Sequence, residues 1–218
     1  QLTGLPLPLV LKPLNQTGGI GVVVAADEAA LKRRVSSSGG FGLPAIAQEF
    51  VDGQDVDLSF LADRGRLISW AVQTRRLDGS LDFISDARVV ELGRRIALAS
   101  SYTGLAHIDM RYDGPWRLGV QIIECNPRFW GSFHFTHGLG TDFLGRGLEL
   151  AAGGRPAPLE RSPTAYCPGL RSALRQAIFK GANFPAGTRA YLREKWLDPL
   201  PELYRVARRL MGHQDQVY

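Results

Sequence analysis

The sequence lacks the features that mark several large classes of protein. It has two cysteines, Cys125 and Cys167, which are too few for a disulfide scaffold and are not spaced like zinc ligands. No apolar run approaches the length of a membrane span, and no charged segment followed by an apolar one opens the chain. Serine, histidine and aspartate are not grouped as a catalytic triad. We therefore expect a cytoplasmic protein whose chemistry needs no covalent nucleophile.

Length and charge are more informative. The chain has 218 residues, of which 44% are hydrophobic and 22% charged, as in ordinary globular proteins with a core. Residues 1–160 hold 16 Lys and Arg against 17 Asp and Glu, whereas residues 161–218 hold 10 against 4. The net charge of +5 therefore belongs to a basic C-terminal extension. Because the chain begins at Gln1 without methionine, we expect an N-terminal portion to be missing.

Hydrophobic spacing predicts an α+β fold built from antiparallel hairpins. In the segment 87–102, Val89, Leu92, Ile96 and Ala99 recur at helical spacing and predict its buried stripe. Alternating or continuous apolar runs separated by turn residues predict strands at 7–12, 20–25, 45–51, 54–63, 66–75, 105–113 and 118–125. Helical spacing also occurs at 142–154, 169–180 and 202–211.

The stretch IIECNPRFWGS ends the last of these strands with polar residues in an unusual order. Side chains alternate along a strand, so Glu124, Asn126 and Arg128 should project to one face, with Cys125 on the opposite face as a small core residue. Pairing with the preceding strand can bring Asp109 beside Glu124. Carboxylate and amide oxygens are the ligands of hard cations such as Mg²⁺. The alternative is a surface turn after an edge strand, ended by Pro127.

A lysine and a glycine loop follow the first predicted strand. Lys12 precedes NQTGGIG, whose backbone amides and neighbouring lysine would suit phosphate groups. The alternative is that the loop is a simple hairpin turn, which is common for such a sequence, and that Lys12 merely extends its charge into solvent from a strand end.

Four segments, in this order, resemble the ATP-grasp superfamily: PLVLKPLNQTGGIGVV, AQEFVDGQDVDLSF, GLAHIDMRYD and IIECNPRFWGS. They are most similar to its carbamoyl-phosphate-synthetase and carboxylate–amine ligase branches, over roughly residues 5–145. The resemblance implies two α+β lobes with antiparallel sheets that grip a nucleotide. We expect a small lobe at 1–52, a large lobe at 53–158 and a basic, largely helical extension at 159–218. The N-terminal domain that the family usually carries is absent from this sequence.

The resemblance also implies roles for individual residues. In the small lobe, Lys12 resembles the residue that contacts the nucleotide phosphates and base. Gly18, Gly19 and Gly21 resemble the loop that closes over the phosphates, and Gln48, Glu49 and Val51 resemble the segment that holds adenine. In the large lobe, Asp55 resembles the acid that binds ribose, although Asp57 lies on the same face. Asp109, Glu124 and Asn126 resemble the metal ligands, and Arg128 resembles the arginine that stabilises the transferred phosphoryl group.

The implied function is an ATP- and Mg²⁺-dependent (or Mn²⁺-dependent) ligase. It would activate a carboxylate as an acyl phosphate for attack by an amine or a similar nucleophile, with Lys12 and Arg128 as catalytic residues. The alternative is a nucleotide-binding module of the same fold without catalysis, used in regulation or assembly. Expected partners are small-molecule carboxylate and amine substrates, with a second copy of the chain in a homo-oligomer as a further alternative. The basic tail makes contact with nucleic acid or a membrane surface a minority interpretation.

Overall fold

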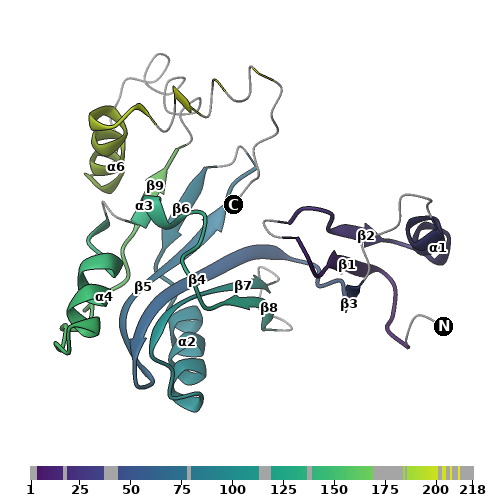
Figure 1. Ribbon diagram of the computed structural model, residues 1–218, viewed down its shortest axis with the longest axis horizontal. Coiled ribbons are helices and arrows are strands. Elements are labelled where there is room, and N and C mark those ends of the chain that lie inside the picture. The colour runs from purple at the N-terminus through teal and green to yellow at the C-terminus, as the bar shows by residue number, and fades with distance from the viewer. Residues whose placement is uncertain are drawn as a thin grey trace. The chain divides into compact units, whose positions relative to one another are not determined.

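The computed structural model divides the chain into two compact units (Figure 1). One unit comprises residues 1–52 together with 207–218, and the other comprises 53–206. The structure describes residues 4–16, 19–36, 44–77, 80–112, 119–136, 139–168, 184, 186–200, 203–204, 207 and 211.

The first unit contains a small antiparallel sheet and one helix. Its strands are β1 (Leu9–Pro13), β2 (Val23–Ala25) and β3 (Ala45–Glu49), in the order β2-β1-β3, and its helix is α1 (Glu28–Ser36). Side chains alternate along β1, so Leu9 and Leu11 face inward and pack with Ala25 and Leu31. Asp27 begins the helix, since its carboxylate accepts a hydrogen bond from the Ala30 amide at 2.7 Å. The strands predicted at 7–12, 20–25 and 45–51 are confirmed.

The second unit is built on a six-stranded antiparallel sheet of order β8-β7-β4-β5-β6-β9. Its strands are β4 (Gln54–Asp63), β5 (Arg66–Arg75), β6 (Leu81–Ile84), β7 (Gly104–Tyr112), β8 (Val120–Asn126) and β9 (Ala165–Cys167). The predicted hairpins β4–β5 and β7–β8 are confirmed, and β4 also pairs with β7 along nine positions. This last pairing, between strands about fifty residues apart in sequence, brings the chemistry together.

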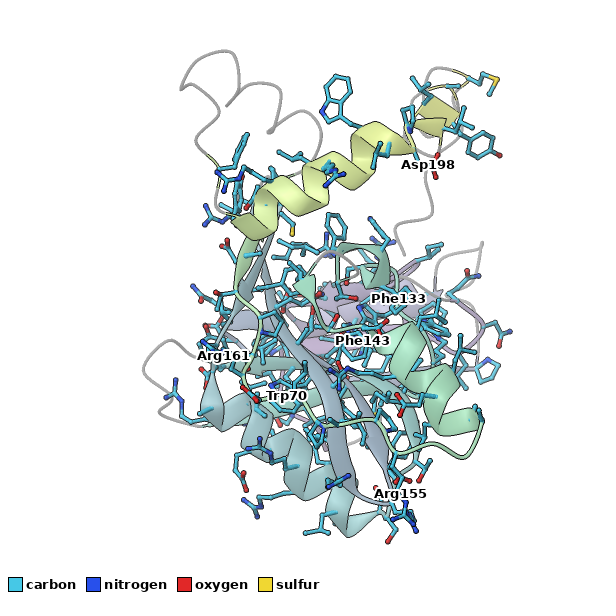
Figure 2. All side chains as sticks on the ribbon, turned by 90° about the vertical axis from the view of Figure 1, so that its left-hand side faces the viewer. Trp70, Phe133, Phe143, Arg155, Arg161 and Asp198 are labelled. Atoms are coloured by element: carbon cyan, nitrogen blue, oxygen red, sulfur yellow. The ribbon has the colours of Figure 1, made fainter. Side chains whose placement is uncertain are left out.

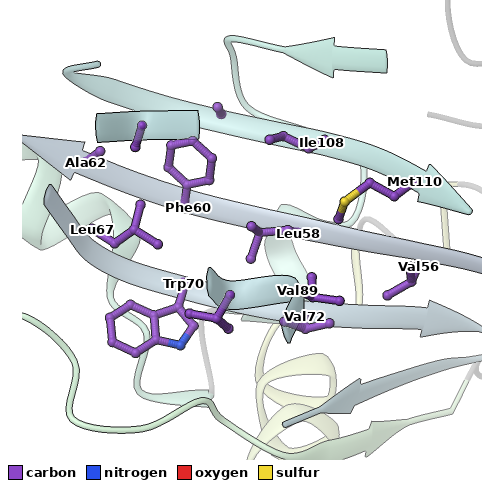
Figure 3. Packing of buried hydrophobic residues seen from close by; sticks show 13 residues of the cluster. Val56, Leu58, Phe60, Ala62, Leu67, Trp70, Val72, Val89, Ile108 and Met110 are labelled. Carbon is purple, nitrogen blue, oxygen red and sulfur yellow. The ribbon is translucent and has the colours of Figure 1, made fainter. Parts of the chain in front are cut away.

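One face of this sheet is covered by α2 (Ala87–Ala99), the helix that the apolar spacing predicts. Asp86 caps its first turn by accepting from the backbone amides of Arg88 and Val89. Val89, Val90 and Ala97 are buried on α2 and belong to one cluster with alternate residues of the central strands (Figure 3). That cluster also contains Val56, Leu58, Phe60, Ala62, Leu67, Trp70, Val72, Ala106, Ile108 and Met110. On strands β4, β5 and β7, this face of the sheet is therefore a packing surface.

The opposite face is apolar at one end and polar at the other. At its apolar end it packs against α3 (Phe133–Thr136) and α4 (Phe143–Ala151), where Trp130, Phe133 and Phe143 contact one another. Figure 2 labels Phe133 and Phe143 at this end. Leu61, Ile68 and Ala71 supply the matching side chains from β4 and β5. The polar part of this face lies toward β7 and β8, and it forms the candidate site described below.

The C-terminal region contributes to the large sheet before it becomes helical. Strand β9 pairs with β6 at the edge, Cys167 is fully buried, and α6 (Ala186–Leu197) lies against β9 (Figure 1). The segment before β9 passes Trp70, whose indole N–H donates to Ser162 Oγ at 2.9 Å. The helix predicted at 169–180 lies outside the described residues, as does most of the one predicted at 202–211. Within the described part of the chain, no helix has the length and hydropathy needed to cross a membrane.

Candidate functional site

The candidate site lies on the polar face of the large sheet, where rows of paired residues cross several strands. In an antiparallel sheet, residues directly opposite one another share a face. The first row consists of Gln73 on β5, Asp57 on β4, Asp109 on β7 and Glu124 on β8. The neighbouring row contains Ser59, His107 and Asn126. The sheet therefore presents three carboxylates, two amides, a hydroxyl and an imidazole on one surface.

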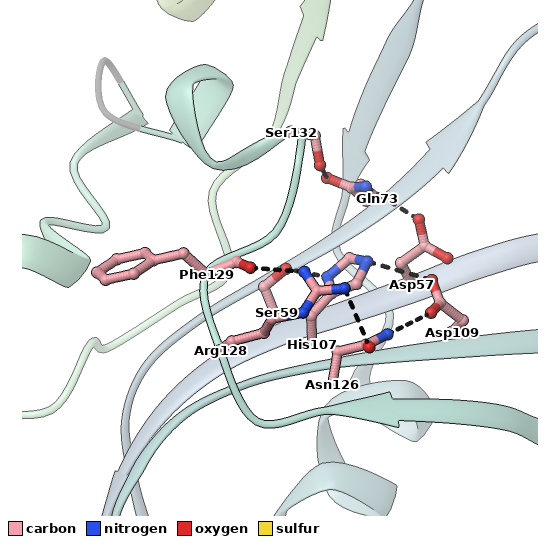
Figure 4. Close-up of polar contacts among 9 residues, drawn as sticks. All are labelled: Asp57, Ser59, Gln73, His107, Asp109, Asn126, Arg128, Phe129 and Ser132. Carbon is pink, nitrogen blue, oxygen red and sulfur yellow. Dashed lines mark hydrogen bonds and ion pairs between the residues drawn. The ribbon is translucent and has the colours of Figure 1, made fainter. Parts of the chain in front are cut away.

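The structure brings four of the predicted large-lobe residues together at the end of β8, and Figure 4 shows three of them, Asp109, Asn126 and Arg128. Asp109 lies opposite Glu124, as the hairpin predicts, and the amide nitrogen of Asn126 donates to Asp109 Oδ2 at 3.0 Å. The Arg128 guanidinium donates to Asn126 Oδ1 at 3.4 Å and to the carbonyl of Phe129 at 2.9 Å. Glu124 is exposed, and its side chain makes no hydrogen bond or ion pair with any described residue. The site residues thus form a connected polar group that ends in an available carboxylate.

Asp57 and His107 belong to the same group, although neither is among the predicted site residues. His107 Nε2 lies 3.2 Å from Asp109 Oδ1, and its Nδ1 lies 2.8 Å from Ser59 Oγ. One ligand atom from each of Asp57, His107 and Asp109 lies within 4.8 Å of the others. The sequence carries a signal for them, since Asp57–Leu58–Ser59 and His107–Ile108–Asp109 alternate polar and apolar residues within otherwise buried strands.

A buried hydrogen-bonded chain orients Asp57. The amide nitrogen of Gln73 donates to Asp57 Oδ2 at 2.9 Å, and Ser132 Oγ donates to Gln73 Oε1 at 3.0 Å. The pKa of Asp57 is raised from 3.8 to about 6, mainly by burial, with smaller contributions in the same direction from Asp109 and Asp55 and opposing ones from His107 and Gln73. The carboxylate is therefore held in place where it lacks the solvation that its charge needs.

Asp55, the predicted ribose ligand, lies on the same face of the sheet, two residues before Asp57 on β4. Its Oδ1 atom accepts from Arg111 Nε at 2.7 Å, across the β4–β7 pair. Asp55 is largely exposed. A ribose hydroxyl would therefore meet a carboxylate that already has a cationic partner.

The predicted small-lobe residues belong to the first unit and are described within it. Lys12 and Gln48 share one face of the small sheet, because Lys12 pairs with Ile46 and Val10 pairs with Gln48. Glu49 pairs with Leu9 and is exposed, and Val51 follows β3. Gly19 and Gly21 have φ values of 76° and 74°, a backbone conformation that favours glycine. Gly18 lies outside the described residues.

The prediction that Cys125 is a core residue is wrong. Cys125 lies opposite Ile108 and thus on the helix-covered face, as alternation requires, but it is exposed. The reason is its position on β8, the edge strand of the sheet, where α2 does not cover it. Cys167 is the buried cysteine, and burial raises the pKa of its thiol to about 12.

Comparisons with known proteins identify the fold. No family model matches the sequence. It is 23% identical over 143 residues to a D-alanine–D-alanine ligase of Granulibacter bethesdensis, covering 56% of this chain and 47% of that protein. An L-amino acid ligase from Bacillus licheniformis matches structurally with a TM-score of 0.54 at 22% identity, covering 77% of this chain and 47% of that one.

A third match is the biotin carboxylase domain of 2-oxoglutarate carboxylase from Hydrogenobacter thermophilus, solved with MgADP and bicarbonate. Its TM-score is 0.53 at 20% identity, and the match covers 73% of this chain and 39% of that one. The chain has the ATP-grasp fold. The resemblance found in the sequence is thereby confirmed at the level of the fold. The chain spans about half the length of the curated ligase and of the L-amino acid ligase that it matches.

The oxygen-rich end of this ATP-grasp sheet fits a hard cation. Asp109 and Glu124 offer carboxylate oxygens from adjacent strands, and the Asn126 side chain is hydrogen-bonded to one of them. Such a donor set suits Mg²⁺ that is shared with phosphate oxygens. Arg128, held against Asn126, adds a second positive charge at the same end of the sheet.

Proposed function

We propose that this chain is the nucleotide-binding and phosphoryl-transfer part of an ATP- and Mg²⁺-dependent ligase that joins a carboxylate to an amine or a similar nucleophile. The observation that carries the proposal is the convergence of Asp109, Glu124, Asn126 and Arg128 at one end of an ATP-grasp sheet. The named ligases among its relatives support the same reaction class.

The proposed reaction proceeds in two steps. An oxygen of the substrate carboxylate attacks the γ-phosphorus of ATP, so that a bond to this oxygen forms and the bond to the β-phosphate oxygen breaks, releasing ADP. The amine nitrogen then attacks the acyl carbon, inorganic phosphate leaves with the electrons of the C–O bond, and the nitrogen loses a proton to solvent.

The protein's part in this reaction is positioning and charge neutralisation. Asp109, Glu124 and Asn126 would hold Mg²⁺, which supplies positive charge to the phosphate oxygens. Arg128 is proposed to donate hydrogen bonds to the transferred phosphoryl group, and its contact with Asn126 keeps the guanidinium beside the metal ligands. Such donors matter most where negative charge spreads over the phosphoryl oxygens in the transition state.

The small sheet is proposed to hold the nucleotide. Lys12 and Gln48 share a face with Val24 and Ile46, whose side chains are 53% and 49% exposed. Exposed apolar side chains beside a lysine suit an adenine ring with phosphates at its end. Gly19, with positive φ and open space at its Cβ position, allows the loop backbone to approach those phosphates.

Trapping of the acyl phosphate tests the reaction class. The full-length protein that contains this chain is supplied with ATP, Mg²⁺, a panel of carboxylates and hydroxylamine, which converts an acyl phosphate to a hydroxamate. We expect carboxylate-dependent hydroxamate in the wild type and at least about 100-fold less in Asn126→Ala and Arg128→Ala, the usual scale for lost transition-state donors. Glu91→Gln, on the exposed side of α2, serves as the matched control.

Near-normal trapping in both site variants would refute the residue assignments. Saturable ATP binding without hydroxamate for any carboxylate would instead leave a nucleotide-binding module without catalysis as the function.

A further inference from the structure

The group formed by Asp57, His107 and Asp109 shares Asp109 with the proposed magnesium ligands but differs from them in its donor atoms. It combines two carboxylates with an imidazole nitrogen, and one ligand atom from each residue lies within 4.8 Å of the others. All three side chains project from paired strands, β4 and β7, in the middle of a sheet. Backbone pairing on both sides therefore fixes the spacing of these ligand atoms.

The imidazole of His107 is held as a metal ligand is held. The residue is 7% exposed, and its ring stacks on Trp130 with a centroid separation of 5.4 Å and an interplanar angle of 6°. Nδ1 lies 2.8 Å from Ser59 Oγ, which is fully buried and can accept a hydrogen bond from Nδ1–H. In that tautomer the lone pair of Nε2 points to the carboxylates. Metal-bound histidines are oriented by such a hydrogen bond at the other ring nitrogen.

Amide donors orient the two carboxylates in the same way. Gln73, which is 1% exposed, donates to Asp57 Oδ2, while its own oxygen accepts from Ser132. Asn126 donates to Asp109 Oδ2, leaving Oδ1 directed at His107. One oxygen of each carboxylate is thus fixed by an amide, and the other remains for a cation. Ligating carboxylates in metal sites carry outer hydrogen bonds of this kind.

The donor set selects the class of cation. Mg²⁺ prefers oxygen ligands and retains its waters, whereas an imidazole nitrogen with two carboxylates suits first-row transition metals and zinc. We propose that Asp57, His107 and Asp109 bind a divalent transition-metal ion or Zn²⁺ in preference to Mg²⁺. This site goes beyond the proposed ligase function, because it requires no nucleotide and uses two residues, Asp57 and His107, that the magnesium site does not.

The test is a titration of the metal-stripped chain with Co²⁺ in the absence of nucleotide, read by visible absorption. We expect one saturable equivalent whose spectrum Zn²⁺ abolishes and a large excess of Mg²⁺ leaves in place. His107→Gln should weaken Co²⁺ binding by at least about tenfold. Loss of a residue that only hydrogen-bonds to a metal ligand already costs about tenfold or more, and loss of a direct ligand should cost at least as much. The substitution should also change the spectrum, because a nitrogen ligand is lost.

The controls separate this proposal from its alternatives. Asp57→Asn should weaken binding as His107→Gln does, whereas Glu91→Gln on the far face of the sheet should bind Co²⁺ like the wild type. Circular dichroism confirms that each variant is folded. Absence of saturable absorption, or equal affinity and an unchanged spectrum in folded His107→Gln, would overturn the proposal. Because no ATP is present, either result leaves the nucleotide-binding experiment independent.

Discussion

Replacing Asp57 by asparagine should stabilise the protein at neutral pH. In the folded protein the pKa of Asp57 is raised from 3.8 to about 6, mainly because burial disfavours its charged form. The folded state therefore holds this proton to higher pH than the unfolded chain does. The resulting stabilisation is fully present below pH 3.8 and is lost as the pH rises through about 6.

The magnitude follows from the size of the shift. A displacement of roughly two pKa units at 1.36 kcal/mol each corresponds to about 3 kcal/mol. Asp57 is only half-buried, so screening by solvent reduces this figure. We expect Asp57→Asn to raise the free energy of unfolding at neutral pH by about 1–3 kcal/mol. Asparagine has nearly the same shape, and its oxygen can still accept the hydrogen bond from Gln73. The substitution therefore removes the charge and retains the contact.

The assay is urea unfolding of wild type and Asp57→Asn between pH 4 and 7.5, in a chelator so that no metal compensates the charge. Contributions from ionisable groups far from Asp57 are common to both proteins and largely cancel in the difference, whereas the interactions of Asp57 with His107, Asp109 and Asp55 remain part of it. The variant should be more stable at pH 7.5, and its advantage should vanish near pH 4. A difference that does not vary with pH, or a less stable variant at pH 7.5, would refute the reasoning.

Three further outcomes follow from packing. In a thermal melt, Gly65→Ala should destabilise the protein by about 1–3 kcal/mol, because Gly65 has φ 83° and an added Cβ would lie 2.9 Å from the Leu98 backbone. Gly147→Ala is the control: Gly147 lies on α4 with open space at its Cβ position, so this substitution should be neutral or stabilising. Leu58→Ala should cost about 2–5 kcal/mol in urea unfolding, since Leu58 is fully buried beneath α2. A thiol reagent should modify exposed Cys125 in the native protein and buried Cys167 only after unfolding; rapid loss of both thiols would contradict the placement of β9.

Local sequence pattern was sufficient to predict much of the fold. Alternation over 54–63, the largely apolar run over 66–75 and apolar spacing over 87–99 predict β4, β5 and α2, because each pattern reflects the faces that the element buries. The short elements β6, β9 and α3 were missed. β9 has three residues and exists because it pairs with β6, some eighty residues earlier, so its own sequence carries little signal.

In the candidate site, too, contacts within one hairpin could be predicted from the sequence and long-range contacts could not. Asp109 and Glu124 could be placed together because they lie on one hairpin, whose register a single sequence can suggest. Asp57 and His107 meet only through the pairing of β4 with β7, a long-range contact that no local pattern reveals. Gln73 reads as an ordinary alternating polar residue on β5, and its burial between Asp57 and Ser132 requires the tertiary structure.

The central claim is a Mg²⁺–nucleotide site that includes Glu124, and thermal unfolding tests it most directly. The chain is melted with and without ATP and Mg²⁺, with Glu124→Gln alongside. At a ligand concentration of 100 times the dissociation constant, binding adds about 2.7 kcal/mol, which is a shift of a few degrees for a chain of this size. A magnesium-dependent shift in the wild type that is absent from Glu124→Gln is the predicted result. An equal shift in both proteins would contradict the role of Glu124, and no shift in either would contradict nucleotide binding by this chain.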